Sequence, residues 1–359
     1  MASLDRVGRI LPGLLPLLVL VSCTATAVSA PAAVNPAPRP AGTAPSPAAV
    51  DLRIAFTETS GANVALWVAE AAGLFQKQQL SVTVDRQLDS AALSALATGS
   101  LDVVVGAAAP AVLAAADGQD LRFVAGLVNQ YPYRLMVAPE INGLADLRGK
   151  RLGIGRSGSV SEAATRLALR LLRLEPGTDV TLLQIGSAAE RLAALENGAI
   201  QGAAVVPPDS VELASLGFHE VLDLMSLDAD APVNQVIVTA RLVREEPRAV
   251  DRLVRALMEA TALARRDREL TKRVLAQHLS TSDPLALDAT YDLFVQQLTQ
   301  RAPYPAALRD LLRELTDGHP RAAALDPAVL VDRSFVQQAV DAGVLIQLYG
   351  EERAPSVRR

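Results

Sequence analysis

The sequence predicts an α/β fold built on a doubly wound, parallel sheet. From residue 51 to residue 240, short apolar stretches typical of strands alternate with loops and with stretches of helical periodicity. This alternation is the order that a parallel sheet with crossover helices produces. About 310 residues follow the first fifty, which is enough for two domains or a single large one. Half of the chain is hydrophobic, which is enough to form a core. Since ligands bind at the carboxyl ends of strands in such sheets, the loops after the strands are the candidate site.

The pattern begins with a strand, a loop and a helix. Residues 51–56 alternate polar and apolar side chains and end in a small polar loop, which is typical of a strand. Residues 62–72 then carry apolar side chains at helical spacing, and Gly73 supplies the stop. The strands that follow are predicted at 80–84, 101–105 and 121–127, and the helices between them at 91–98 and 110–117.

A second α/β unit follows residue 146, and a helical segment follows Pro247. Residues 236–240 form an apolar stretch that predicts a strand leading back to the first unit. The strands of the second unit are predicted at 151–154, 181–185, 203–206 and 221–224, and its helices at 160–174, 188–197 and 211–216. The helices of the last third are predicted at 248–266, 268–278, 285–300, 304–315 and 334–342.

Residues 1–22 have the layout of a secretory signal. Arg6 and Arg9 give a positive start, and the apolar stretch 10–21 follows. That stretch is too short for a membrane-spanning helix, which needs roughly 20 apolar residues. One processing of this signal would be cleavage at a small-residue site, such as after Ala30; the alternative is cleavage directly before Cys23.

The end of this signal contains Cys23, the only cysteine of the chain. Residues 20–23, Leu-Val-Ser-Cys, resemble a bacterial lipobox, in which the cysteine is lipidated and the chain is cut just before it. Residues 23–50 are mostly Ala, Pro, Thr and Ser and cannot bury enough apolar surface to fold. We therefore expect a lipid anchor at Cys23, followed by a disordered tether.

Neither the composition nor the known motifs indicate catalysis. The formal charge of −5 does not suggest a nucleic-acid partner. A lone cysteine excludes intrachain disulfides and thiolate metal clusters. His219, His278 and His319 stand at no metal-ligand spacing, and neither G-x-S-x-G nor H-E-x-x-H occurs. We expect no catalytic residue, no metal and no cofactor.

The loop at residues 155–159 is a candidate contact for a ligand. Ser157 and Ser159 lie where a strand gives way to a helix, and the free N–H groups of a helix start suit an anionic or polar atom. Ser159 and Glu162 also have the spacing of a capping box. A cap alone and a cap with a ligand contact both remain open.

Several larger side chains near the predicted loops also have two interpretations. Trp67 on the first helix and the pair Tyr131 and Tyr133 can fill the core or can stack on a ligand. Arg134 and Arg156 can pair with an anion or can lie on the surface.

Four stretches follow one another in a fixed order: 66–75 with 80–82, then 95–102, 147–153 and 195–204. Together they resemble bacterial ABC-transporter solute-binding proteins of the nitrate/sulfonate/taurine and thiamine-pyrimidine-precursor branch. Residues 66–75, Leu-Trp-Val-Ala-Glu-Ala-Ala-Gly-Leu-Phe, are similar to the opening helix of that family. Gln79 stands where the family has glycine, and Gln201 and Gly202 replace its usual acidic step.

This resemblance implies a two-lobed Venus flytrap, the type II periplasmic binding protein fold, to which the helical pattern of the sequence adds a C-terminal extension. Lobe I would contain residues 51–135 and 238–359, and lobe II residues 136–237. The ligand would lie between the lobes and be enclosed by hinge closure. The implied ligand contacts are Thr57, Ser60, Asn63, Trp67, Ala107, Ala108, Asn129, Gln130, Tyr131, Ser157, Ser159, Val160, Pro207, Asp209 and Asn234.

The function implied is that of an extracytoplasmic substrate-binding lipoprotein of an ABC importer. It would be exported, anchored to the bacterial membrane through Cys23 and monomeric, and it would deliver its solute to a membrane permease. The solute would be small and organic or anionic, such as a sulfonate, nitrate or a pyrimidine-like compound. Because the predicted loops are mostly Ala, Gly, Ser and Asn, they favour a neutral or weakly anionic ligand. An exported enzyme on the same fold and a sensory or scaffolding binding protein are the alternatives.

Overall fold

The computed structural model describes residues 49–227, 230–297, 305–316 and 319–350. The predicted signal, the lipidation site Cys23 and nearly all of the predicted tether lie outside the described residues. Within the described ranges, none of the helices is both long enough and apolar enough to cross a membrane.

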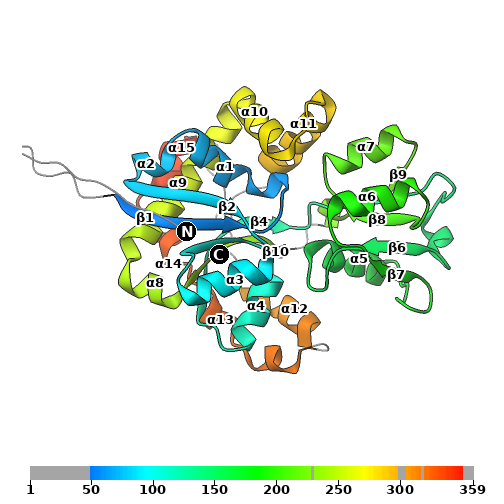
Figure 1. Cartoon of the computed structure of the whole chain (residues 1–359), viewed down its shortest axis with the longest axis horizontal. Coiled ribbons are helices and arrows are strands. Elements are labelled where there is room, and N and C mark those ends of the chain that lie inside the picture. Colours follow the sequence, from blue (N-terminus) through cyan, green and yellow to red (C-terminus); the bar gives the residue numbers. More distant parts are fainter. Residues whose placement is uncertain (1–48, 228–229, 298–304, 317–318, 351–359) are drawn as a thin grey trace, which may run out of the picture. The chain divides into compact units, whose positions relative to one another are not determined.

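The first sheet has five strands in the order β2-β1-β3-β10-β4 (Figure 1). Strands β1, β2 and β3 are parallel, whereas β10 runs antiparallel to both β3 and β4. The returning strand β10 is longer than the predicted 236–240 and begins inside the predicted lobe II. The strands are β1 (Val50–Phe56), β2 (Leu80–Arg86), β3 (Val103–Gly106), β4 (Leu121–Gln130) and β10 (Asp230–Thr239).

The second sheet also has five strands, in the order β7-β6-β8-β5-β9. Here β6 is parallel to β7 and β8, while β5 is antiparallel to β8 and β9. Both sheets are therefore mixed, and the expectation of a wholly parallel sheet is wrong, because β5 and β10 each run against their neighbours. The strands are β5 (Arg134–Val137), β6 (Arg151–Ile154), β7 (Thr181–Gln184), β8 (Gly202–Val205) and β9 (His219–Asp223).

The helices that connect the strands lie where the periodicity predicts them. A 3-10 turn, η1 (Gly61–Asn63), precedes the first helix, and α5 ends three residues earlier than predicted. The short helix α2 was not predicted. The helices are α1 (Val64–Ala71), α2 (Leu74–Lys77), α3 (Asp89–Thr98), α4 (Ala108–Ala116), α5 (Val160–Leu171), α6 (Ala188–Glu196) and α7 (Asp209–Ser215), with 3-10 turns η2 (Leu144–Leu147) and η3 (Leu224–Leu227).

The helical last third is confirmed, but the helix predicted over 285–300 is not continuous. It divides into α11 and a stretch of π-helix, η4, and its last residues lie outside the described ranges. The elements are α8 (Ala240–Glu245), α9 (Pro247–Arg266), α10 (Arg268–Leu279), α11 (Pro284–Tyr291), η4 (Asp292–Gln297), α12 (Pro305–Thr316), η5 (Pro320–Ala324), α13 (Pro327–Leu330), α14 (Ser334–Asp341) and α15 (Val344–Tyr349).

These C-terminal helices complete the core on both faces of the first sheet (Figure 1). Side chains alternate between the faces of a strand, so Val103 and Val105 of β3 lie in one hydrophobic cluster and Val104 lies in another. The cluster around Val103 includes Leu253 of α9, and the cluster around Val104 includes Leu308 of α12. The helical extension is thus an integral layer of the first sheet, which places some of its residues near the ends of the strands.

Candidate ligand-binding site

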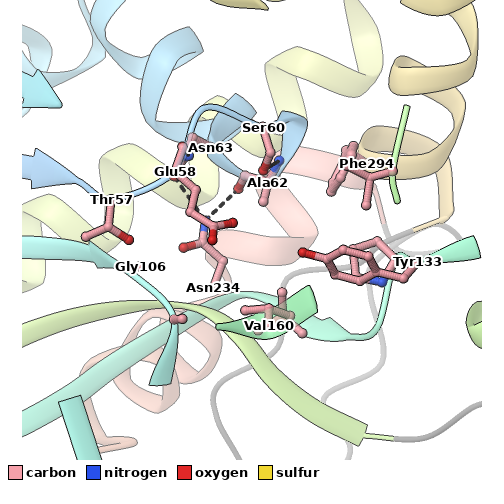
Figure 2. A pocket seen from close by; sticks show the side chains of 14 residues that line it. Thr57, Glu58, Ser60, Ala62, Asn63, Gly106, Tyr133, Val160, Asn234 and Phe294 are labelled. Atoms are coloured by element: carbon pink, nitrogen blue, oxygen red, sulfur yellow. Dashed lines mark hydrogen bonds between the residues drawn. The ribbon is translucent and has the colours of Figure 1, made fainter. Parts of the chain in front are cut away.

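A pocket lies where β1 and β3 end, beside residues of the second sheet and its helices (Figure 2). Its empty space is about 360 Å³, a volume that includes open solvent at the mouth. The position agrees with the rule that ligands bind at the carboxyl ends of strands. The lining residues are Thr57, Glu58, Ser60, Ala62, Asn63, Gly106, Ala107, Pro132, Tyr133, Val160, Val206, Val233, Asn234 and Phe294.

The loop after β1 is held in place by side-chain amides. The Asn63 Nδ2 donates to the carbonyl oxygen of Glu58 at 2.6 Å. The Asn234 Nδ2, from β10, donates to the carbonyl oxygen of Ala62 at 2.9 Å and to the Asn63 Oδ1 at 3.1 Å. Ser60 caps η1 by accepting from the Ala62 N–H at 3.3 Å. Both N–H groups of the Asn234 amide and one of the two on Asn63 are therefore occupied in fixing the loop.

The Thr57 hydroxyl is buried and has no hydrogen-bond partner in the described part of the chain. The Thr57 N–H continues the sheet by donating to the Val105 carbonyl oxygen at 3.1 Å, so the residue is held at the end of β1. A Cβ on Gly106 would lie 2.5 Å from this hydroxyl oxygen, so only glycine leaves room for it. A buried hydroxyl without a partner costs about 1 to 3 kcal/mol, which a polar ligand atom in the pocket would recover.

The Glu58 carboxylate points into the pocket (Figure 2). The residue is half-buried, and its carboxylate forms neither a hydrogen bond nor an ion pair with the residues described. Burial raises the pKa of Glu58, and the negative charge of Asp89 raises it further. Arg191, Arg156 and Arg86 lower this pKa, but none of the three lines the pocket. The site therefore has an unpaired acid in its wall.

Tyr133 faces Glu58 from the start of β5 (Figure 2). Its side chain is buried, and this burial raises the pKa of its phenol. The negative charge of Glu58 raises that pKa further, to a smaller extent. The Tyr133 hydroxyl is thus a neutral group that can donate to a ligand or accept from it.

Asp209, at the start of α7, does not line the pocket. Its burial raises its pKa to about 6, although the positive charge of Arg191 acts in the opposite direction.

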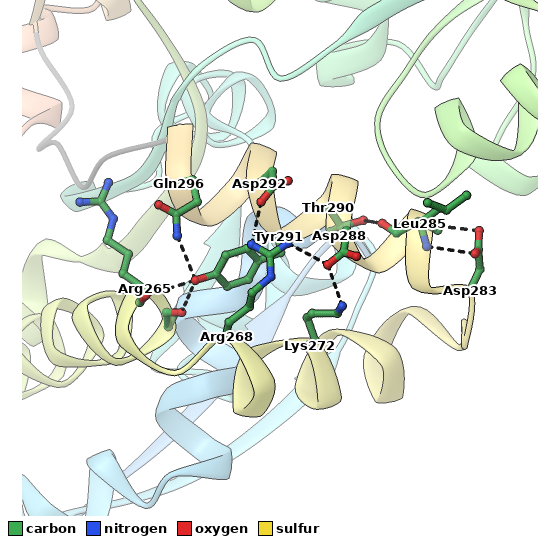
Figure 3. A network of polar contacts seen from close by, with 12 residues as sticks. Arg265, Arg268, Lys272, Asp283, Leu285, Asp288, Thr290, Tyr291, Asp292 and Gln296 are labelled. Carbon is green, nitrogen blue, oxygen red and sulfur yellow. Dashed lines mark hydrogen bonds and ion pairs between the residues drawn. The ribbon is translucent and has the colours of Figure 1, made fainter.

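Phe294 enters the pocket from the π-helix η4, which follows α11. A polar network fixes this region (Figure 3). Arg268 donates to Asp288 at 2.7 Å and to Asp292 at 2.9 Å, and its guanidinium lies 4.3 Å from the centre of the Tyr291 ring. The Tyr291 hydroxyl accepts from the Gln296 Nε2 at 3.0 Å. The contacts on both sides of Phe294 hold its ring against the loop.

A second pocket of about 280 Å³, including its open side, lies beside the first one. It is formed by the starts of α4 and α5, with Tyr131 and Leu311. The predicted cap at α5 is confirmed, because the Ser159 Oγ accepts from the Glu162 N–H at 3.3 Å. The Glu162 carboxylate accepts from the Gly158 N–H at 2.8 Å. The residues that line both pockets are Ala107, Val160 and Val233.

The structure brings part of the predicted contact set together. The first pocket contains Thr57, Ser60, Asn63, Ala107, Val160 and Asn234. The second contains Ala107, Ala108, Tyr131, Ser159 and Val160. Their role as ligand contacts stays a prediction. The predicted contacts that line neither pocket are Trp67, Asn129, Gln130, Ser157, Pro207 and Asp209.

Two of these residues also take part in the packing of the fold, and their role as ligand contacts stays a prediction. Trp67 is fully buried in the core, where its ring stacks on His278 with 4.3 Å between ring centres. The Asn129 Oδ1 accepts from the Gln235 Nε2 at 3.0 Å, which joins β4 to β10.

The sequence did not single out Glu58 or Phe294. Glu58 stands inside a predicted loop, but a carboxylate in a polar loop is usually solvated. Phe294 lies in the helical third, where no motif pointed to the site.

The comparisons with known proteins agree with this architecture. The model of the NMT1-like family matches residues 45–280. No curated protein sequence matches the chain. The periplasmic aliphatic sulphonate binding protein SsuA from Escherichia coli has a TM-score of 0.67 and 21% identity, with 79% of this chain and 92% of that chain covered.

Two further solved structures show the same fold. The alkanesulfonate-binding protein SsuA from Xanthomonas axonopodis pv. citri, bound to MOPS, has a TM-score of 0.64 and 22% identity over 80% of this chain and 100% of that one. The periplasmic nitrate-binding protein NrtA from Synechocystis PCC 6803 has a TM-score of 0.66 and 16% identity over 86% and 92%. The family model covers well over half of the sequence and the fold is that of periplasmic binding proteins, so the chain belongs to the NMT1-like family.

Proposed function

We propose that the chain is an extracytoplasmic solute-binding protein of an ABC importer and that it works as a monomer with a membrane permease. The observation that carries the proposal is the origin of the pocket walls. Thr57 and Gly106 come from strand ends of the first sheet, while Val160 and Val206 belong to the second sheet and its helices. A pocket between two such units can be enclosed by hinge closure.

The proposal divides the body into two lobes near the predicted bounds. Because β5 pairs within the second sheet and β10 within the first, the first lobe would contain residues 51–133 and 230–359 and the second lobe residues 134–227. The solute would be small and organic or anionic, such as a sulfonate, nitrate or a pyrimidine-like compound. The solved structures named above are binding proteins for sulfonates or nitrate. The roles of these three neighbours support binding of a solute without its chemical transformation, which is the role that we propose here.

A thermal-shift panel of sulfonates, nitrate, pyrimidines and aromatic acids tests solute binding. At a ligand concentration of 100 times Kd, the free energy of unfolding rises by about 2.7 kcal/mol, so Tm should rise by several degrees for at least one compound. Thr57→Val removes the unpartnered hydroxyl with little change in shape and should reduce this shift without lowering the Tm of the free protein. Thr83→Val, on the exposed side of β2, is the matched control. A panel in which no compound moves Tm would overturn the proposal.

We also propose that the protein is exported and anchored to the cell membrane by lipid at Cys23. Each buried acyl CH₂ contributes about 0.8 kcal/mol to membrane binding, so loss of the lipidated residue should release the protein. Fractionation of cells that produce Cys23→Ser should show the protein in the soluble fraction. Ser46→Ala in the predicted tether is the control and should stay with the membranes. An unchanged membrane fraction for Cys23→Ser would rule out the anchor.

A further inference from the structure

We infer that the pocket takes a solute that presents a protonated nitrogen, or a nitrogen with N–H donors, to the Glu58 carboxylate. Nitrate and sulfonates without such a nitrogen are then poor ligands. The inference rests on the proposed function and narrows the range of solutes named there to nitrogen bases and amines.

The first support is the position of Glu58. The Asn63 amide fixes the Glu58 carbonyl oxygen at 2.6 Å, so the residue is held one position beyond Thr57 at the edge of the pocket. Its carboxylate and the Tyr133 hydroxyl point into the same space (Figure 2). A half-buried carboxylate without a partner is unfavourable. An ammonium or N–H group on the ligand would satisfy it with a charge-assisted hydrogen bond.

The second support is the balance of donors and acceptors in the wall around Glu58. Asn234 uses both of its side-chain N–H groups within the loop, and Asn63 uses one of its two. The hydroxyl groups of Thr57, Ser60 and Tyr133 can each accept as well as donate. Among the described residues, no Lys, Arg or His side chain lines the pocket. A nitrate or sulfonate group here would meet a carboxylate without a cation to offset the repulsion.

The third support is that none of the nearby arginines that the structure describes pairs with the Glu58 carboxylate. The Arg191 side chain is buried, and its Nη1 donates to the Gly186 carbonyl oxygen at 3.1 Å, while its Nε has no hydrogen-bond partner among the described residues. Arg156 lies 3.7 Å from the Asp89 carboxylate. These arginines lower the pKa of Glu58 and so favour its ionised form. They form no ion pair with its carboxylate, which stays free for a ligand.

Matched pairs of probes test the inference, because in each pair an oxygen replaces a nitrogen that carries N–H groups. The probes are 2-aminoethanesulfonate with 2-hydroxyethanesulfonate, 4-aminopyrimidine with 4-methoxypyrimidine, which cannot form a ring N–H by tautomerisation, and nitrate alone. Titration calorimetry at pH 7 compares the wild type, Glu58→Gln and Glu196→Gln. Glu196 is an exposed carboxylate at the end of α6, so its variant makes the same change of charge outside the pocket.

The nitrogen member of at least one pair should bind the wild type about tenfold or more tightly than its oxygen partner, as expected for a hydrogen bond to a charged group. Glu58→Gln should remove most of this preference, and Glu196→Gln should keep it. Equal binding of both members, or tight binding of nitrate or 2-hydroxyethanesulfonate, would overturn the inference and leave the proposed function standing. If Glu58→Gln does not fold, the comparison of pairs on the wild type decides. If neither these probes nor the thermal-shift panel shows binding, both the inference and the proposed function fail.

Discussion

Replacing Trp67 with alanine should lower the free energy of unfolding by about 3 to 5 kcal/mol, because it empties a large, fully buried position. The indole stacks on His278 with 4.3 Å between ring centres and meets the Phe56 ring edge-on at 5.7 Å, so both neighbours lose a packing surface. Burial also lowers the pKa of His278, and that pKa should return toward its usual value when the indole is removed. Urea unfolding followed by circular dichroism measures the loss, since Trp67 is the only tryptophan and its fluorescence disappears with it.

A substitution outside the core gives the control for this result. Leu88→Ala removes a side chain that is 48% exposed and should change the free energy of unfolding by no more than about 0.5 kcal/mol. Trp67→Phe keeps an aromatic ring in the core, and solute affinity should stay unchanged because Trp67 lines neither pocket. A change of less than 1 kcal/mol for Trp67→Ala would contradict its role in the core.

Much of the fold could be predicted because local periodicity carries it. Strand β6 has the predicted bounds, 151–154, since an apolar stretch there is bounded by charged residues and glycine. Strand β10 was predicted too short, because Pro232 lies in its first half and proline argues against a strand. Strand β5, Arg134–Val137, was not predicted, because it begins two residues after Pro132, and proline there indicates a loop. The change from α11 to π-helix leaves no mark in the pattern of apolar residues.

The candidate site was less predictable than the fold, because its walls come from distant parts of the chain. Thr57, Asn63 and Asn234 could be found, since each belongs to a loop or strand that the topology brings to the sheet edge. The role of Glu58 in the pocket could not be predicted, because only the tertiary packing determines whether its carboxylate has a hydrogen-bond or ion-pair partner. Phe294 reaches the pocket through the tertiary packing of η4, and no local pattern near residue 294 encodes that contact.

The close approach between Phe294 and Gly61 gives a second large effect. A Cβ on Gly61 would collide with the Phe294 ring and would lie 2.8 Å from the Thr290 Cγ2. Both neighbours are buried, and the Thr290 hydroxyl donates to the Ala286 carbonyl oxygen at 2.7 Å, so neither side chain has room to withdraw. Gly61→Ala should therefore lower the free energy of unfolding by about 1 to 3 kcal/mol. Urea unfolding measures this, with Gly143→Ala as the control, because a Cβ on Gly143 meets nothing within 4 Å.

A double-mutant cycle assigns this cost to Phe294. Leucine is smaller than phenylalanine and can turn away from a new methyl group, so Phe294→Leu should cost less in the Gly61→Ala background than in the wild type. The coupling free energy should reach about 1 kcal/mol, within the range for residues in direct contact. If the changes in the free energy of unfolding caused by the two substitutions add to within about 0.5 kcal/mol, the Phe294 ring is not what makes a side chain at residue 61 unfavourable. Because Phe294 also lines the pocket, the same two substitutions should change the affinity for the solute. Such a change would show that η4, an element of the helical last third, is part of the binding site.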